Sequence, residues 1–212
     1  MDNKGILTVV SGFSGAGKGT VINALLKNHE DYALSISMTT RAPREGEEEG
    51  KHYFFVTKDE FEDEINAGGL LEYANYCGNY YGTPRSYVEK CLEEGKNVLL
   101  EIEEQGAVKI KEIMPNAVLI FVIAPSAAEL KDRLIGRGTE NLDTVKKRLN
   151  RAVEEADGVK DYDFVVINND PDECAMHVDE IIRASKQRTN NYVKTVEKIK
   201  EDLKNILKGD IS

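Results

Sequence analysis

The sequence is poor in the residues that build disulfide frameworks and metal sites. Its 212 residues include three cysteines and three histidines. The two nearest cysteines, Cys77 and Cys91, are fourteen positions apart, and no Cys-x-x-Cys pair occurs. An odd, widely spaced set of cysteines argues against both a disulfide framework and a zinc site. The histidines are scattered, and we expect them at the surface.

Long apolar runs are also missing. No stretch approaches the roughly eighteen consecutive apolar residues of a membrane span, and the apolar run near the N-terminus, Gly5 to Val10, is too short for a signal peptide. We therefore expect a protein that does not engage a membrane and that works in the reducing cytoplasm.

Positive charge is in deficit. Lys and Arg number 28 against 38 Asp and Glu, which gives a formal net charge of −10. A chain this acidic is a poor match for a nucleic acid polymer, which needs a broad basic face. A local basic pocket for one phosphorylated ligand remains compatible, because electrostatic fields are local and screened by salt.

Short apolar runs alternate with amphipathic stretches along most of the chain. We predict strands over 5–11, 97–102, 117–123 and 163–168, and helices over 18–28, 103–115, 126–138, 141–157 and from 170 onward to about 207. This alternation favours an α/β core with a parallel sheet. Shorter predicted strands, such as 34–40 and 52–56, interrupt the rhythm and indicate an inserted lobe. Thr83 is predicted to cap a helix that has Pro84 in its first turn.

A glycine-rich segment, GFSGAGKGT (12–20), connects the first predicted strand and helix. Gly12, Gly17 and Lys18 match G-x-x-x-x-G-K, the phosphate-binding P-loop. Bare backbone N–H groups and the helix N-terminus converge on phosphate oxygens, and Lys18 adds one full charge. Gly19 stands where a serine or threonine often contacts magnesium, so we expect metal contact through Thr20 or water.

The inserted segment carries a second candidate phosphate site. Arg41 and Arg44 lie three positions apart and are followed by Tyr53, so two guanidinium groups and a phenol can hold a phosphate. The Glu72 carboxylate can accept hydrogen bonds from N1–H and the amino group of guanine, whereas adenine has an acceptor at N1. These features predict a site that discriminates between purine bases.

The order of the motifs TTRAPREGE, LLE, GNYYGT, LEIEEQG and GRGTE behind the P-loop resembles guanylate kinase, to about residue 186. The resemblance implies transfer of a phosphoryl group from ATP to GMP and dGMP, with Mg²⁺. It implies that the residues holding ATP are Gly12, Ser14, Gly15, Ala16, Gly17, Lys18, Gly19 and Thr20. It implies that the residues holding GMP are Ser37, Arg41, Arg44, Tyr53, Glu72, Tyr81, Thr83 and Glu103. Catalytic roles are implied for Lys18, Arg41, Arg137 and Arg148.

The same resemblance implies a P-loop NTPase-type three-layer core, an inserted mixed α/β GMP-binding lobe and a helical lid. We place the core at 1–34, 92–125 and 159–212, the lobe at 35–91 and the lid at 126–158. A helical extension begins at about 187.

Three departures from the family pattern are Phe13 for proline, His52 for an acid and Glu103 for aspartate. We expect them to tune affinity rather than abolish function. The alternatives are a non-catalytic binding module on the same fold, another nucleoside monophosphate kinase, and an interaction role for the apolar positions spaced along 193–206. The sequence leaves open whether the chain is a monomer or a homodimer.

Overall fold

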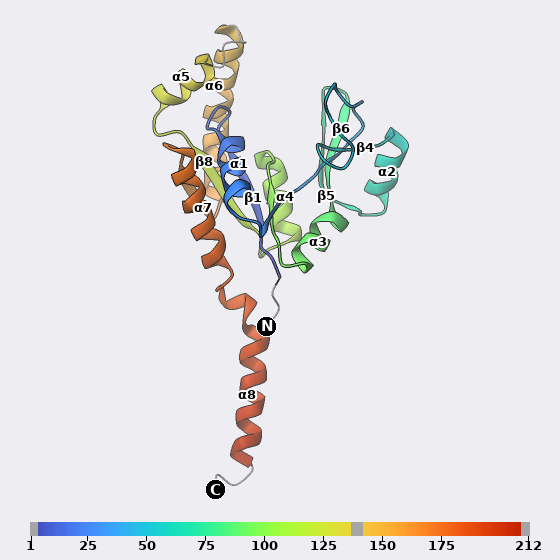
Figure 1. The fold of residues 1–212 in the computed structure, drawn as a ribbon, viewed down its shortest axis with the longest axis vertical. Coiled ribbons are helices and arrows are strands. Elements are labelled where there is room, and N and C mark those ends of the chain that lie inside the picture. Colours follow the sequence, from blue (N-terminus) through green and yellow to red (C-terminus); the bar gives the residue numbers. More distant parts are fainter. Residues whose placement is uncertain (1–3, 137–141, 209–212) are drawn as a thin grey trace.

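A five-stranded parallel sheet forms the centre of the larger body in the computed structural model, which describes residues 4–136 and 142–208 (Figure 1). Its strands, in the order β2-β7-β1-β8-β9 across the sheet, are β1 (Leu7–Gly12), β2 (Tyr32–Leu34), β7 (Asn97–Leu100), β8 (Val118–Ile123) and β9 (Phe164–Ile167). The three central strands are almost completely buried, as continuous apolar runs in a parallel sheet should be. The predicted α/β core with a parallel sheet is confirmed.

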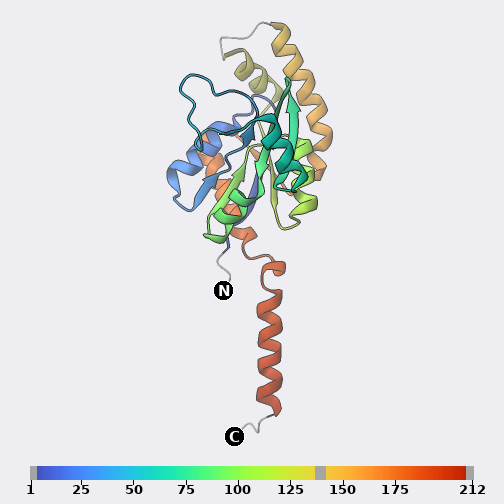
Figure 2. The ribbon, with the colours of Figure 1, turned by 90° about the vertical axis from the view of Figure 1, so that its right-hand side faces the viewer.

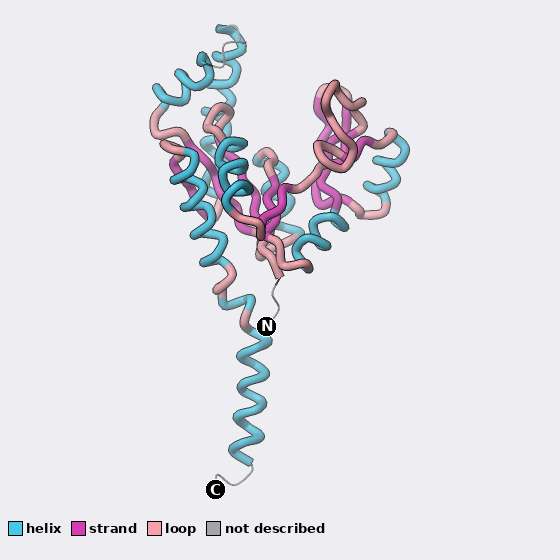
Figure 3. Tube along the Cα trace, viewed as in Figure 1, coloured by secondary structure: helices cyan, strands magenta, loops and turns pink. Residues whose placement is uncertain are grey.

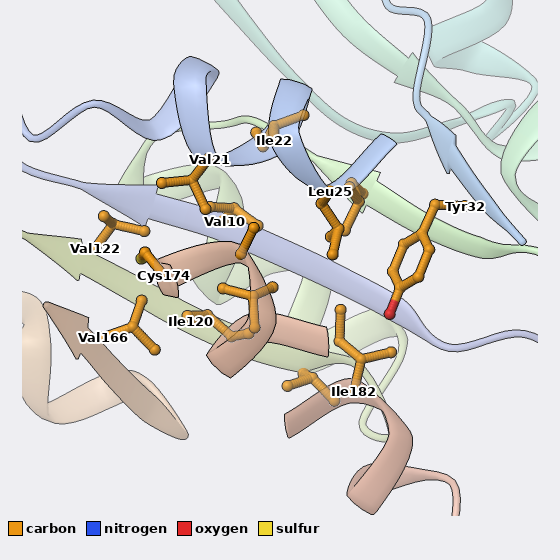
Figure 4. Close-up of a cluster of buried hydrophobic side chains, with 14 of the residues drawn as sticks. Val10, Val21, Ile22, Leu25, Tyr32, Ile120, Val122, Val166, Cys174 and Ile182 are labelled. Carbon is orange, nitrogen blue, oxygen red and sulfur yellow. The ribbon is translucent and has the colours of Figure 1, made fainter. Parts of the chain in front are cut away.

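Helices cover both faces of this sheet. On one face lie α1 (Lys18–Asn28) and α7 (Pro171–Ser185), and Figure 4 shows their side chains meeting over β1. On the other face lie α3 (Arg85–Glu93) and α4 (Glu104–Ile113), which bury a second apolar cluster. The start of α7 is the predicted one, because the Asp170 carboxylate accepts hydrogen bonds from the N–H groups of Asp172 and Glu173, each at 3.0 Å.

The inserted segment forms a smaller sheet in the order β4-β3-β6-β5, set apart from the core on one side of the molecule (Figure 3). Its elements are β3 (Met38–Thr39), β4 (Phe54–Phe55), α2 (Lys58–Asn66), β5 (Leu70–Tyr76) and β6 (Asn79–Pro84). Parallel and antiparallel pairings coexist in it, as expected of a mixed lobe. The ring of Phe61, from α2, is fully buried and stacks on Tyr80 at a centroid distance of 5.1 Å.

Two local predictions were wrong in this region. The single strand predicted over 34–40 is two strands, because the chain leaves the core sheet after Leu34 and joins the lobe sheet at Met38. Thr83 does not cap a helix. It pairs with Glu72 inside the lobe sheet, and its hydroxyl bonds to the Glu72 carboxylate, so Pro84 occupies the N-cap and α3 begins at Arg85.

Two helices, α5 (Ala127–Gly136) and α6 (Leu142–Asp157), rise at the same end of the core as the lobe, and the two parts flank an open space (Figure 1). The last helix, α8 (Val193–Lys208), points away from the opposite end of the core in both views (Figures 1 and 2). Within the described ranges, no helix has the length and apolar character needed to cross a membrane.

The burial of Phe61 predicts that it holds the lobe together. Truncation of a fully buried phenylalanine removes contacts and leaves a cavity, so Phe61→Ala should lower the free energy of unfolding by about 3–5 kcal/mol. Phe164, which is 38% exposed on β9, is the matched control, and Phe164→Ala should cost about 1 kcal/mol or less. Urea unfolding followed by circular dichroism measures both, and equal losses would contradict this role for Phe61.

Candidate active site

The segment between β1 and α1 has a backbone that favours glycine at three positions, Gly12, Gly15 and Gly17. Gly12 has φ 150°, and a Cβ there would collide with the Val122 carbonyl group of β8. Gly17 has φ 88°, in the left-handed region, and forms the N-cap of α1. The loop therefore passes very close to the neighbouring strand and turns sharply into the helix, as a phosphate-binding loop requires.

Two contacts outside the motif hold this loop in place. The side-chain amide of Asn168, just after β9, donates to the Ala16 carbonyl oxygen at 2.8 Å and is buried. The ring of Phe13 packs edge-on against Phe121 of β8, with ring centroids 5.1 Å apart. Phe13, the departure from proline, thus serves as a packing residue. The contribution of Asn168 was missed in the sequence, because it lies 152 positions from its partner.

The polar groups of the loop are engaged with its own backbone. The Lys18 ammonium donates to the carbonyl oxygens of Gly12 at 2.7 Å and Phe13 at 3.3 Å. The Thr20 hydroxyl donates to the Gly17 carbonyl oxygen at 2.6 Å. The first turn of α1 contains no acidic residue of its own, and the positive end of the helix dipole lies at this end of the helix. At Gly19 an added Cβ would meet only the Glu101 carboxylate, at 4.0 Å.

A cavity of about 790 Å³ lies between this loop and the helices at the end of the core. Gly12, Ser14 and Lys18 line it from the loop, and Thr144 and Arg148 line it from α6. The structure therefore brings together Lys18 and Arg148, two of the four residues predicted to be catalytic. Arg137 falls outside the described residues.

A second cavity, of about 350 Å³, adjoins the first on the side of the lobe. Its lining includes five of the residues predicted to hold GMP, namely Ser37, Tyr53, Glu72, Tyr81 and Glu103. Both cavities share the side chains of Tyr53, Glu101, Ile102 and Glu103. The two cavities are therefore contiguous along these four residues.

The Glu72 carboxylate is the most buried acidic group of the second cavity. Burial raises its pKa, and this effect is opposed by the hydrogen bond from Thr83 and by the positive charge of Lys109. The Thr83 hydroxyl, fully buried, donates to Glu72 Oε1 at 2.7 Å. Thr83 therefore lies in the predicted site, where it orients Glu72 from behind rather than lining the cavity itself.

The two arginines of the inserted loop are organised by an acid that the sequence did not single out. Glu47 accepts from the Arg41 guanidinium at 2.9 Å and from the Arg44 backbone N–H at 2.7 Å. Its hydrogen bond to Arg41 lowers the pKa of the Glu47 carboxyl group. The guanidinium of Arg41 also lies over the ring of Tyr53, 5.4 Å from its centroid. Neither Arg41 nor Arg44 lines the two cavities.

The remaining departures from the family pattern take different positions. His52 is exposed, and its Nδ1 accepts a hydrogen bond from the Glu48 backbone N–H at 3.0 Å. The longer side chain of Glu103 reaches Arg151 on α6, at 2.8 Å, and Arg151 also contacts Glu155 at 3.1 Å. Glu103 thus links the second cavity to α6, a contact that the sequence did not reveal.

The comparison with known proteins decides the family. The guanylate kinase family model matches residues 4–185. The chain belongs to the guanylate kinase family. The guanylate kinase of Clostridioides difficile (strain 630) is 49% identical over 201 residues, covering 94% of this chain and 98% of that protein. The guanylate kinase of Lactococcus lactis subsp. lactis (strain IL1403) is 44% identical over 204 residues, covering 96% and 100%.

A solved structure agrees with this assignment. The crystal structure of guanylate kinase from Anaplasma phagocytophilum matches with a TM-score of 0.67 and 37% identity, over 88% of each chain. The chain is accordingly an ATP:GMP phosphotransferase, as the resemblance implied. The alternatives of a non-catalytic module and of another nucleoside monophosphate kinase find no support in these relatives.

The contacts of Glu47 predict an effect on acceptor binding. In Glu47→Ala, Arg41 and the loop backbone lose charge-assisted hydrogen bonds, and KM for GMP should rise about tenfold or more. Glu48→Ala is the matched control, since that side chain pairs only with the exposed Lys51, and KM should change by less than about twofold. Steady-state kinetics with varied GMP tests this, and similar KM values for the two variants would contradict it.

Proposed function

We propose that the two adjoining cavities bind donor and acceptor, so that the γ-phosphoryl group of ATP passes directly to the phosphate of GMP or dGMP. The observation that carries this proposal is the shared wall of Tyr53, Glu101, Ile102 and Glu103. This shared lining supports an arrangement in which a phosphate held by the loop lies opposite a phosphate held by the lobe, as in-line transfer demands.

On this proposal the loop from Gly12 to Thr20 holds ATP, and Lys18, Arg41, Arg137 and Arg148 stabilise the charge of the transferring group. Arg41, Arg44, Tyr53 and Tyr81 hold the phosphate of GMP. The guanine is recognised by Ser37, Glu72, Thr83 and Glu103. The acceptor oxygen is already anionic at neutral pH, so positioning and charge stabilisation carry the reaction without a strong general base.

Magnesium suits this donor set. Among the described residues, no group of three or more His, Cys, Asp and Glu side chains could hold a metal. Thr20 offers a hydroxyl at the start of α1, with lone pairs left over after it donates to Gly17. These groups fit an ion that retains phosphate oxygens and water as its main ligands. When bound, Mg²⁺ supplies neutralisation of the phosphate charge.

We propose further that the boundaries 35–91 for the lobe and 126–158 for the lid mark parts that close over the core. Arg41 and Arg44 lie outside the cavity around Lys18, so the lobe must approach the core before their charges reach the transferring group. Closure also excludes water, which would otherwise compete with GMP as acceptor. The helical extension predicted from about 187 contains α8. The cytoplasmic compartment is a proposal that rests on the sequence alone, and the sequence leaves open whether the chain is a monomer or a homodimer.

The deciding experiment is an ADP-release assay with ATP and Mg²⁺ that compares GMP, dGMP, AMP, CMP and UMP. Turnover confined to GMP and dGMP supports the proposal. Turnover with AMP overturns the role of Glu72 as guanine reader, and nucleotide binding without turnover on any acceptor overturns catalysis.

Replacing Lys18 tests the donor site. Lys18→Met removes the one charge on the loop that reaches the phosphates, and kcat should fall by about a hundredfold or more. Lys27→Met, at the exposed end of the same helix, is the control and should retain the activity of the original chain. A loss of less than about threefold in Lys18→Met would contradict the assigned role.

A further inference from the structure

The second cavity concentrates negative charge. Glu72, Glu101 and Glu103 all line it, and among the described lining residues Lys109 is the one cation. Burial raises the pKa of the Glu72 carboxyl group, and the loss of water when a ligand binds strengthens the effect of each nearby charge. Glu72 consequently needs a nearby cation if it is to stay ionised inside the cavity.

Positive charge is unevenly distributed among the three carboxylates. Glu103 has Arg151 at 2.8 Å, and Glu101 lies in the cavity of Lys18. Glu72 is the most buried of the three, and its environment contains the Thr83 hydroxyl on β6 and the ammonium of Lys109 on α4. Tyr53, Tyr73 and Tyr81 complete the set of titratable groups among the described residues that line this cavity.

Lys109 is held at this place by the fold. It lies on α4, which packs against β5, the strand that carries Glu72. Its ammonium lies over the ring of Tyr73, 5.6 Å from the centroid, and Tyr73 in turn packs edge-on against Phe61. A cation–π contact of this kind fixes a flexible lysine side chain near one position. The backbone of α4 also comes close, since a Cβ at Gly106 would lie 3.3 Å from Glu72 Oε2.

We infer that Lys109 is a specificity-determining residue, which keeps Glu72 ionised inside the closed acceptor cavity and thereby maintains the preference for guanine over adenine. The inference deepens the proposed function and rests on it. An ionised Glu72 accepts from the N1–H and amino group of guanine. A protonated Glu72 presents one O–H donor and one carbonyl acceptor, which match N1 and the amino group of adenine instead.

Loss of Lys109 should change the pH dependence of GMP binding in a defined direction. Burial already raises the pKa of Glu72, and the positive charge of Lys109 opposes that rise. Loss of Lys109 must therefore raise the pKa further, so that Glu72 becomes protonated at a higher pH. Affinity for GMP should then decline earlier as the pH falls, while the binding of AMP should improve over the same range.

The test is a pH series from 5 to 8.5 on the full chain, with KM and kcat measured for GMP and AMP. In Lys109→Met, the bend in KM for GMP should move upward by about half to one pH unit, with kcat changed less than about twofold. The ratio of kcat/KM for GMP to that for AMP should fall several-fold near pH 6 and little near pH 8. Lys109→Arg should restore the original profile, and Lys90→Met on α3 should leave it unchanged.

A purely structural role for Lys109 would give a different pattern. A factor that is constant across the pH series, or an equal effect of Lys109→Met in a Glu72→Gln background, overturns the inference. Identical profiles for Lys109→Met and the original chain overturn it as well. Failure of the original chain to phosphorylate GMP at any pH would instead overturn the proposed function, so the two failures are distinguishable.

Discussion

The close approach of the phosphate-binding loop to β8 is the constraint on which the rest of the site depends. Gly12 leaves no room for a side chain beside Val122, and the Asn168 amide fixes the far side of the loop through Ala16. The loop is thereby anchored to β8 and to the residue that follows β9 rather than to its own helix alone. A loop held in this way has a fixed backbone before any ligand arrives, which lowers the reorganisation that binding requires.

Because the chain is acidic overall, the cations of the site need specific contacts that keep them from pairing with other carboxylates. In this structure Lys18 bonds to loop carbonyl groups, Arg41 to Glu47 and Arg151 to Glu103. Each cation is thus oriented by the protein itself, and a phosphate has to replace or share these contacts. Both side chains of the Arg41–Glu47 pair are mostly shielded from solvent, whereas those of the Arg151–Glu103 pair are exposed. The Arg41–Glu47 pair therefore fixes its guanidinium in a better-defined position.

The layered core was predictable because its signals are local. Buried strands appear as apolar runs, and the P-loop and the Asp170 cap are contiguous motifs. Predictions failed where a distant partner decides the outcome. Threonine before proline is typical of a helix N-cap, yet the Thr83 hydroxyl donates its hydrogen bond to Glu72 across the sheet. Asn168 supports a loop 152 positions away, and Glu47 and Arg151 act through side-chain geometry that spacing alone does not encode.

The predicted site residues likewise differ in whether local sequence or the distant fold decides their position. Those fixed by a short motif, such as Ser14 and Lys18, line the first cavity, and Glu72 and Tyr81 line the second. Arg41 and Arg44 line neither cavity. Their distance from the core depends on the position of the lobe relative to the core, which sequence order does not determine.

Gly19 has one further consequence. The space beside it is open as far as the Glu101 carboxylate, so packing alone does not exclude a side chain at this position. The hydroxyl that position 19 lacks could therefore be restored by substitution. A single serine at position 19 would add a hydroxyl-bearing side chain in this open space, without a clash against the backbone. A hydroxyl at the start of α1 is thus one substitution away on the same scaffold, and evolution or engineering could introduce it without remodelling the loop.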